Sequence, residues 1–201
     1  MNTTNIKGIL SVGASFEDRF IPDIERLAIV TKNLQDSGYK VVLTQGVYDL
    51  IHEGHGKYLA RAKEQGDILV VGVDTDELTR KRKGKNRPVV PETERLRMLT
   101  LLRSVDIVTL RTMSASEEDV DYLHKALRPD VFVMSTTTKD FPLEKRVEIE
   151  KHVGKVEIFE PQAETSSTAR IRNLMIDGVA GLEAELSKTV QEYLKKIGSQ
   201  S

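Results

Sequence analysis

Cysteine and tryptophan are both absent from the 201-residue chain, and aromatic residues make up only 5% of it. The lack of cysteine excludes a disulfide framework and fits a reducing compartment. No apolar run approaches the roughly 20 residues that a membrane-spanning helix needs. Residues 1–5 also lack the charged and then apolar layout of a secretory signal. We therefore expect a cytoplasmic protein that has no membrane partner.

An excess of charge of either sign is also missing. The chain has 30 Lys and Arg residues against 31 Asp and Glu residues, which gives a formal net charge of -1. A balanced chain has no bulk attraction for nucleic acid or anionic lipid, so no nucleic-acid partner is expected. The 39% hydrophobic and 30% charged residues are typical of a globular protein of one ordinary domain.

Short apolar runs alternate with helically spaced apolar residues along most of the chain. Strands are predicted at residues 40–44, 67–73, 106–110, 131–134 and 156–159. Helices are predicted at about 22–36, 54–65, 92–103, 117–127, 142–152, 168–176 and 182–197. This alternation favours an α/β fold, namely a Rossmann-like, doubly wound parallel sheet of five strands with helices on both faces.

The ends of the chain lie outside this pattern. Residues 1–39 are expected to form an N-terminal extension with one helix packed on the domain, in which residues 9–13 form a short strand or an ordered arm. The single domain is expected at 40–180, followed by a C-terminal helix at 181–201. The polar stretch after the second strand is predicted to be a long loop.

One stretch, from Thr44 to Leu59, organises the candidate site: T-Q-G-V-Y-D-L-I-H-E-G-H-G-K-Y-L. It runs from a strand through a glycine loop into a helix, and α/β sheets bind ligands outside the carboxyl ends of their strands. A helix that begins near Gly54 directs unpaired backbone N–H groups and its positive dipole end at such a ligand, which favours an anion. His52 and His55 add two imidazole donors. We interpret the stretch as a phosphate-binding site.

Two simpler interpretations of His52 and His55 stay open. A His-x-x-His pair can bind a metal, although the chain has no cysteine, and His124 and His152 lie in stretches without ligand spacing. We therefore expect no structural zinc and no metal-ligating residues here. Alternatively, the two histidines stand by chance at an exposed helix start.

Residues 46–55, G-V-Y-D-L-I-H-E-G-H, resemble the G-x-F-D-x-x-H-x-G-H signature of the cytidylyltransferase-like nucleotidylyltransferases, with Tyr48 in place of the commoner Phe. The resemblance implies that His52 and His55 donate to the α-phosphate of a nucleoside triphosphate. It also implies a nucleotide-binding role for the glycines and the residues between them. These are Gly46, Val47, Tyr48, Asp49 and Gly54. Asp49 either orients His52 or a metal, or stabilises the loop by accepting backbone N–H groups.

Residues 80–87, R-K-R-K-G-K-N-R, hold six basic groups and no acid. Such a run is usually a solvated loop or a nucleic-acid patch. Here it follows the second strand, whose carboxyl end lies beside that of the first, where a second phosphate-bearing reactant needs cations. The pattern K-G-x-x-R-P-V-x-P-x-x-x-R at 83–95 is similar to a segment of heptose-1-phosphate adenylyltransferases, and related segments occur in glycerol-3-phosphate cytidylyltransferases. Lys83 and Arg80 are thereby expected to hold the acceptor phosphate.

Arg95 closes the same pattern, and its guanidinium either clamps phosphate or holds the loop by pairing with a carboxylate. We assign it, with Asp74 and Lys139, to acceptor binding. Residues 135–140 lack the Gly and acidic residues that heptose and glycerol relatives usually carry for the acceptor, which leaves the acceptor's identity open.

Near the C-terminus, residues 165–172 place hydroxyl side chains at a predicted helix start, which by itself indicates an ordinary N-cap. The segment resembles the S-[ST]-T-x-x-I segment of the same family. That resemblance implies that Ser167 and Thr168 bind the nucleotide's phosphates and that Arg170 stabilises the departing pyrophosphate.

Together these motifs predict a nucleotidyltransferase that moves a nucleoside monophosphate, with AMP favoured, from a triphosphate to a phosphorylated small molecule such as a sugar phosphate. The expected cofactor is Mg²⁺, and a homodimer is expected by resemblance. Alternatives are CTP-dependent cytidylyl transfer to glycerol 3-phosphate or another alcohol phosphate, adenylyl transfer to FMN, and a nucleotide-binding regulator without turnover.

Overall fold

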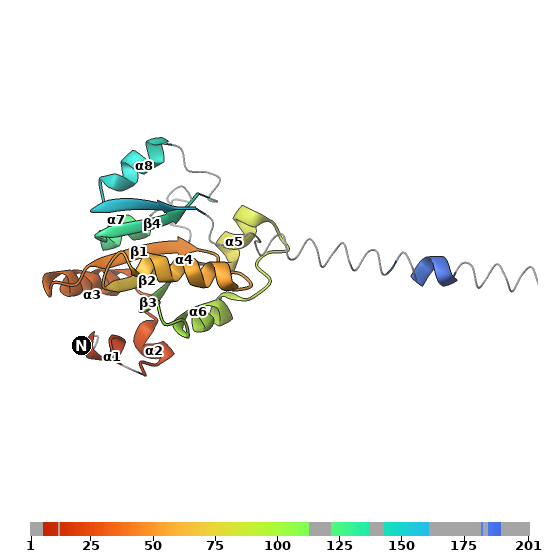
Figure 1. Ribbon diagram of the computed structural model, residues 1–201, viewed down its shortest axis with the longest axis horizontal. Coiled ribbons are helices and arrows are strands. Elements are labelled where there is room, and N and C mark those ends of the chain that lie inside the picture. Colours follow the sequence, from red (N-terminus) through yellow and green to blue (C-terminus); the bar gives the residue numbers. More distant parts are fainter. Residues whose placement is uncertain are drawn as a thin grey trace, which may run out of the picture. The chain divides into compact units, whose positions relative to one another are not determined.

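The computed structural model describes residues 6–11, 13–112, 122–136, 143–160, 182 and 185–189. Five parallel strands form a sheet in the order β3-β2-β1-β4-β5 (Figure 1). The strands are β1 (Val41–Gly46), β2 (Ile68–Asp74), β3 (Ile107–Arg111), β4 (Val131–Ser135) and β5 (Lys155–Phe159). The helices are α1 (Ile6–Ile9), α2 (Phe16–Arg19), α3 (Ile24–Asp36), α4 (Glu53–Lys63), α5 (Asp76–Lys83), α6 (Glu92–Thr100), α7 (Tyr122–Leu127) and α8 (Leu143–Glu150). This order confirms the predicted doubly wound parallel sheet.

Contacts divide the chain into two compact units, residues 1–163 and 164–201. The sheet and all eight helices named above belong to the first unit. In the second, residues 182 and 185–189 are described, and they are helical. The predicted limits of the extension and the C-terminal helix, after residues 39 and 180, stay predictions.

Side chains along β1 alternate between two cores on opposite faces of the sheet. Val41 and Leu43 belong to one core, to which α3, α7 and α8 contribute. Val42 belongs to the other, to which α4 and α6 contribute. Each fully buried Val or Leu stabilises the fold by about 1.5–3 kcal/mol relative to an exposed one. Helices therefore cover both faces, as predicted.

The strand order reverses between β1 and β4, and their pairing is short. β1 pairs with β2 over all six of its residues, but with β4 only from Val42 to Thr44. At the last of these pairs the Tyr58 hydroxyl of α4 joins both strands: it lies 2.8 Å from Thr44 Oγ1 and donates to the carbonyl of Val133 at 3.1 Å. Beyond Thr44 the two strands no longer pair, which is the position at which doubly wound sheets bind ligands.

Of the two alternatives for residues 9–13, the short strand is wrong, because α1 ends at Ile9 and a turn follows it. Ile9 is buried in the α3 core, so its apolar side chain needs no strand partner. The edge of β3 is instead covered by a later segment, where Phe20 forms a bridge to Val108 and Ile21 N–H donates to the Val108 carbonyl at 3.0 Å.

The expected long loop after β2 is also partly wrong, because α5 occupies residues 76–83. Its start and stop signals are present in the sequence. The Thr75 side chain accepts Leu78 N–H at 3.2 Å, acids fill the first turn, four basic residues fill the last, and Gly84 follows with φ 96°. Only Leu78 and Thr79 are buried, so the apolar periodicity that reveals most helices is too weak here.

Within the described ranges, no helix has the length and apolar composition needed to cross a bilayer.

Candidate active site

The loop between β1 and α4 has an unusual backbone. Tyr48 and Leu50 have φ angles of 53° and 46°, in the left-handed region that side chains with a Cβ rarely adopt. Each such residue costs roughly 1–2 kcal/mol. A strained loop of this kind persists only where surrounding contacts hold it, and such loops cluster at functional sites.

Asp49, between these two residues, supplies one set of those contacts. Its buried carboxylate accepts Val89 N–H at 3.0 and 3.1 Å and Val90 N–H at 3.0 Å, and it lies 3.0 Å from Arg87 Nη2. These partners match one of the two roles considered for Asp49, the bonding of backbone N–H groups. The carboxylate thereby ties the histidine loop to residues 87–90.

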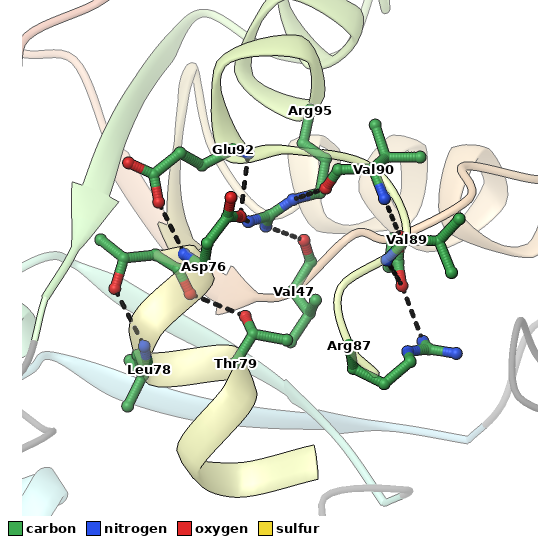
Figure 2. Close-up of polar contacts among 11 residues, drawn as sticks. Val47, Asp76, Leu78, Thr79, Arg87, Val89, Val90, Glu92 and Arg95 are labelled. Carbon is green, nitrogen blue, oxygen red and sulfur yellow. Dashed lines mark hydrogen bonds and ion pairs between the residues drawn. The ribbon is translucent and has the colours of Figure 1, made fainter. Parts of the chain in front are cut away.

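Arg95 supplies the second set of contacts. Its side chain is only 1% exposed, and its guanidinium donates in three directions (Figure 2). Nε donates to the Val90 carbonyl at 2.9 Å, Nη1 to the Val47 carbonyl, and Nη2 to Asp76 Oδ1 at 2.7 Å. Of the two roles considered for Arg95, these contacts are those of a residue that holds loops. The role of Arg95 in acceptor binding stays a prediction, because these contacts of its guanidinium are all with protein groups.

His52 and His55 lie at the first turn of α4 and cap it reciprocally. Gly54 N–H donates to His52 Nδ1 at 3.1 Å, and His52 N–H donates to His55 Nδ1 over a longer 3.4 Å. The ring centroids are 4.1 Å apart. Because each Nδ1 accepts a hydrogen bond, a neutral ring carries its proton on Nε2. The pair therefore presents two Nε2–H donors side by side.

This cap changes the expected anion site. Gly54 N–H bonds to the His52 ring, and His55 N–H bonds to the His52 carbonyl at 2.9 Å. These two amides therefore serve the cap, although the sequence argument left them for a ligand. The imidazoles take over the donor role, and the amides orient them.

The surroundings of His55 keep its imidazole neutral. Burial lowers the pKa of His55 from 6.5 to about 4, assisted by the positive charges of His52 and Lys83 and opposed by Asp49. At neutral pH the ring is thus a hydrogen-bond donor that carries no charge. Lys83 contributes to this shift from the last turn of α5.

Lys83 lies among several charged side chains at the end of α5. Its pKa is lowered, first by desolvation and then by the charge of Arg87, while Asp74 and Asp49 oppose the shift. Although its side chain is exposed, neighbouring protein atoms displace part of its hydration. A partly desolvated ammonium binds an incoming phosphate more strongly than a fully hydrated one. Arg80, one turn earlier, is exposed.

Asp74, at the end of β2, is fully buried between two arginines. Arg82 Nη1 donates to its Oδ2 at 3.0 Å, and Arg111 Nε lies 2.8 Å from its Oδ1 without the alignment of a hydrogen bond. These contacts occupy the carboxylate within the protein, and its predicted role in acceptor binding stays a prediction.

Gly46 and Tyr48 share a small space. A Cβ added to Gly46 would lie 3.3 Å from Tyr48 Cε2, so the glycine makes room for the buried ring. Burial raises the pKa of Tyr48 well above its usual value, and its ring centroid lies 5.6 Å from that of His55. The Tyr48 ring thus packs beside the His55 imidazole. The neighbouring Val47 is held by Arg95, which donates to the Val47 carbonyl.

The structure ties the histidine loop to residues 87–90 and to Arg95, and it adds residues to which the sequence argument assigned no role. Lys139, Ser167, Thr168 and Arg170 lie outside the described residues. The additions are Asp76, Arg82, Arg87, Glu92 and Arg111. All but Arg87 stand in the first or last turn of a helix or at the end of a strand, and these are positions that the sequence of an α/β protein can reveal.

Among the described residues no three His, Asp or Glu side chains gather closely enough to bind a metal ion. The described part of the site offers imidazole and cationic donors, whereas Mg²⁺ prefers oxygen ligands.

A strand, a strained loop and a histidine-capped helix meet at the switch point of the sheet, where α/β folds bind ligands. In the comparison with known families, the cytidylyltransferase-like family matches residues 43–174, and the chain belongs to it.

Two relatives are similar to most of this chain. The Bifunctional protein HldE of a Nitratiruptor species is 36% identical over 160 residues, which cover 78% of this chain and 33% of the relative. That of Citrifermentans bemidjiense is 37% identical over 160 residues, covering 79% and 32%. The chain thus spans about a third of the length of these relatives.

Solved structures give the same fold. The lipopolysaccharide core biosynthesis protein from Thermoplasma volcanium matches with a TM-score of 0.52 and 30% identity, covering 64% of this chain and 100% of that one. A pantoate-beta-alanine ligase from Francisella tularensis matches with a TM-score of 0.57 over 77% of this chain and 72% of its own, but at 12% identity it shows the fold alone.

Proposed function

We propose that this protein transfers AMP from ATP to the phosphate of a phosphorylated sugar and releases pyrophosphate. The observation that carries the proposal is the pair of Nε2–H donors on His52 and His55, oriented by the α4 cap at the sheet's switch point. The family and the relatives named for lipopolysaccharide core biosynthesis and HldE favour a sugar phosphate as acceptor.

The proposed reaction is a single displacement. An oxygen of the acceptor's phosphate forms a bond to the α-phosphorus while the bond from that phosphorus to the bridging oxygen of the β-phosphate breaks. The electron pair leaves with pyrophosphate. Because a phosphate monoester is already largely dianionic at pH 7, its second pKa being near 6, the attacking oxygen needs no general base.

That chemistry explains the use of a neutral imidazole at His55. Negative charge on the non-bridging oxygens of the α-phosphate needs donors that are aimed in advance, and a capped Nε2–H is such a donor. Lys83 supplies the positive charge that lets two anionic reactants meet. Thr168 and Arg170, with Ser167, are proposed to bind the β- and γ-phosphates.

Mg²⁺ is proposed to be bound mainly by the nucleotide's own phosphate oxygens and water, because the described side chains offer it few oxygen ligands. Bound there, it supplies charge neutralisation. We further propose a homodimer in the cytoplasm, on the family resemblance alone, and light scattering of the purified chain will test the dimer.

The test is pyrophosphate release from ATP, CTP, GTP and UTP with sugar 1-phosphates, glycerol 3-phosphate and FMN as acceptors, each with Mg²⁺. We expect ATP with a sugar 1-phosphate to give the fastest release. Preference for CTP with glycerol 3-phosphate would replace the proposal with cytidylyl transfer. Nucleotide binding without release from any pair would identify a regulator instead of an enzyme.

A further inference from the structure

Helices α5 and α6 start face to face and cap each other. Asp76 is the first residue of α5, and Glu92 is the first residue of α6. Asp76 N–H donates to Glu92 Oε2 at 2.6 Å, and Glu92 N–H donates to Asp76 Oδ1 at 2.9 Å (Figure 2). Each carboxylate thereby satisfies an amide at the start of the other helix and lies at its positive dipole end.

Arg95 ties this reciprocal cap to the histidine loop. Its guanidinium donates to the same Asp76 Oδ1 at 2.7 Å and also to the carbonyls of Val47 and Val90. We call Asp76, Glu92 and Arg95 the helix-start junction. It joins the loop after β1, the start of α5 and the start of α6.

Helix α5 depends on this junction for its orientation. The helix is strongly polar, with Leu78 and Thr79 as its buried residues. At its last turn, Arg82 pairs with the buried carboxylate of Asp74 on the sheet through an arginine side chain that is 39% exposed. At its first turn, the reciprocal cap fixes the start of the helix to α6. The cap is therefore one of two attachments that set the direction of α5.

Small errors at this attachment matter because Lys83 lies at the far end of the helix. Lys83 stands seven positions after Asp76, which corresponds to about 10 Å of helix. A rotation of about 10° at the junction would move the Lys83 end by roughly 2 Å. A misplacement of about 1 Å in an active site can already cost a hundredfold in rate.

We propose that Glu92 and Asp76 are positioning residues, which hold α5 so that Lys83 meets the acceptor's phosphate opposite His55. This inference rests on the proposed function, because it takes Lys83 to contact the acceptor. Arg95 and Asp49 hold the histidine loop by other bonds. Loss of Glu92 therefore affects acceptor binding and turnover more than nucleotide binding.

The test compares Glu92→Ala with Glu94→Ala. Both changes remove a carboxylate from the first turn of α6, so they alter the helix dipole equally. Glu94 is exposed, whereas Glu92 accepts the Asp76 amide. We expect Glu92→Ala to lower kcat/KM for the acceptor by up to about tenfold, no more than the loss of Lys83 itself does, with the KM of ATP changed less than about twofold. Glu94→Ala stays within about twofold of wild type in both constants.

Two further variants separate positioning from general stability. Glu92→Gln keeps an oxygen that accepts the Asp76 amide, so it should recover most of the lost activity. In a Lys83→Ala background, Glu92→Ala should cost much less than it does alone, because the group that it positions is gone. Full additivity of the two changes, or equal effects of Glu92→Ala and Glu94→Ala, would overturn the proposal.

Hydrogen exchange gives a readout that does not depend on activity. Amides of residues 76–83 should exchange at least about tenfold faster in Glu92→Ala than in Glu94→Ala or wild type. Unchanged exchange would reject the junction as the attachment of α5. If wild type releases no pyrophosphate from any substrate pair, the proposed function fails while this measurement still decides whether the junction orients the helix.

Discussion

The histidine loop, residues 47–52, and the basic turn of α5, residues 80–83, flank the same site but are held in opposite ways. The loop is tied by a buried carboxylate and a buried guanidinium, and it keeps two residues at positive φ. The side chains of the basic turn are exposed, and the turn is held by the ion pair between Arg82 and Asp74 and by the cap at the other end of the helix. Under the proposed function, the reacting phosphate meets donors that are aimed in advance, whereas the acceptor meets charge that can adapt to it.

The largest effect should follow from releasing the loop. Asp49→Ala removes a buried carboxylate that accepts two backbone N–H groups and faces Arg87. Breaking a buried ion pair from one side typically costs about 3–5 kcal/mol, so the free energy of unfolding in urea should fall by that amount. Asp36→Ala, which breaks only an exposed ion pair with Lys32, should cost less than about 0.5 kcal/mol. Similar losses in the two variants would show that Asp49 does not hold the loop.

The second-largest effect should follow from the loss of one imidazole donor while the histidine loop stays in place. His55→Ala should lower kcat on the order of a hundredfold, about 3 kcal/mol in the barrier, because one preorganised donor to the α-phosphate is lost. Thermal unfolding should show a folded protein. His152→Ala, a histidine beside Glu148 at the end of α8, is the matched control and should keep full activity. A near-normal rate in His55→Ala would exclude this histidine from the mechanism.

The pH dependence of stability probes the same imidazole. The pKa of His55 is about 4 in the folded protein, below its ordinary 6.5, so between these values the unfolded chain binds more protons. The neutral His55 therefore adds to the free energy of unfolding in full above pH 6.5, and this contribution is lost as the pH falls toward 4. Each pKa unit corresponds to about 1.4 kcal/mol, so the loss reaches up to about 3 kcal/mol.

The measurement is the free energy of unfolding in urea between about pH 4 and pH 7.5. His55→Gln should decline less steeply with acid than wild type over this range. Parallel curves for wild type and His55→Gln would mean that the imidazole is not kept neutral by its surroundings.

The smallest effect should come from the basic turn. Lys83→Ala should raise the KM of the acceptor about tenfold, since a hydrogen bond to a charged group contributes about 1.5–3 kcal/mol. The KM of ATP should change little, and added salt should weaken acceptor binding less in the variant than in wild type. Lys81→Ala removes the same charge from the same helix and should change the acceptor's KM less than about twofold. Equal effects of the two variants on the acceptor's KM would show that Lys83 acts only through the general positive charge of the helix, without a specific contact to the acceptor.

Much of the first unit follows from local patterns. β2 is visible as an unbroken apolar run because both of its faces are covered, and the helix after His55 is visible through Leu59 and Ala62. Helix α5 escaped prediction because a helix that buries two side chains leaves little periodicity, although its cap and charges were there to see. The roles proposed for Lys139, Ser167, Thr168 and Arg170 stay predictions.

The sequence by itself determined the alternation of strands and helices, the place of the site at a strand's end, and the two histidines at a helix start. These depend on neighbours a few residues apart, whose spacing the chain displays directly. Tertiary structure alone decided that Asp49 binds residues 87–90, that Asp76 and Glu92 cap each other's helices, and that Arg95 donates to the carbonyls of two loops. Those contacts join residues 16 to 48 positions apart, and only the packing of the sheet and its helices brings them within reach.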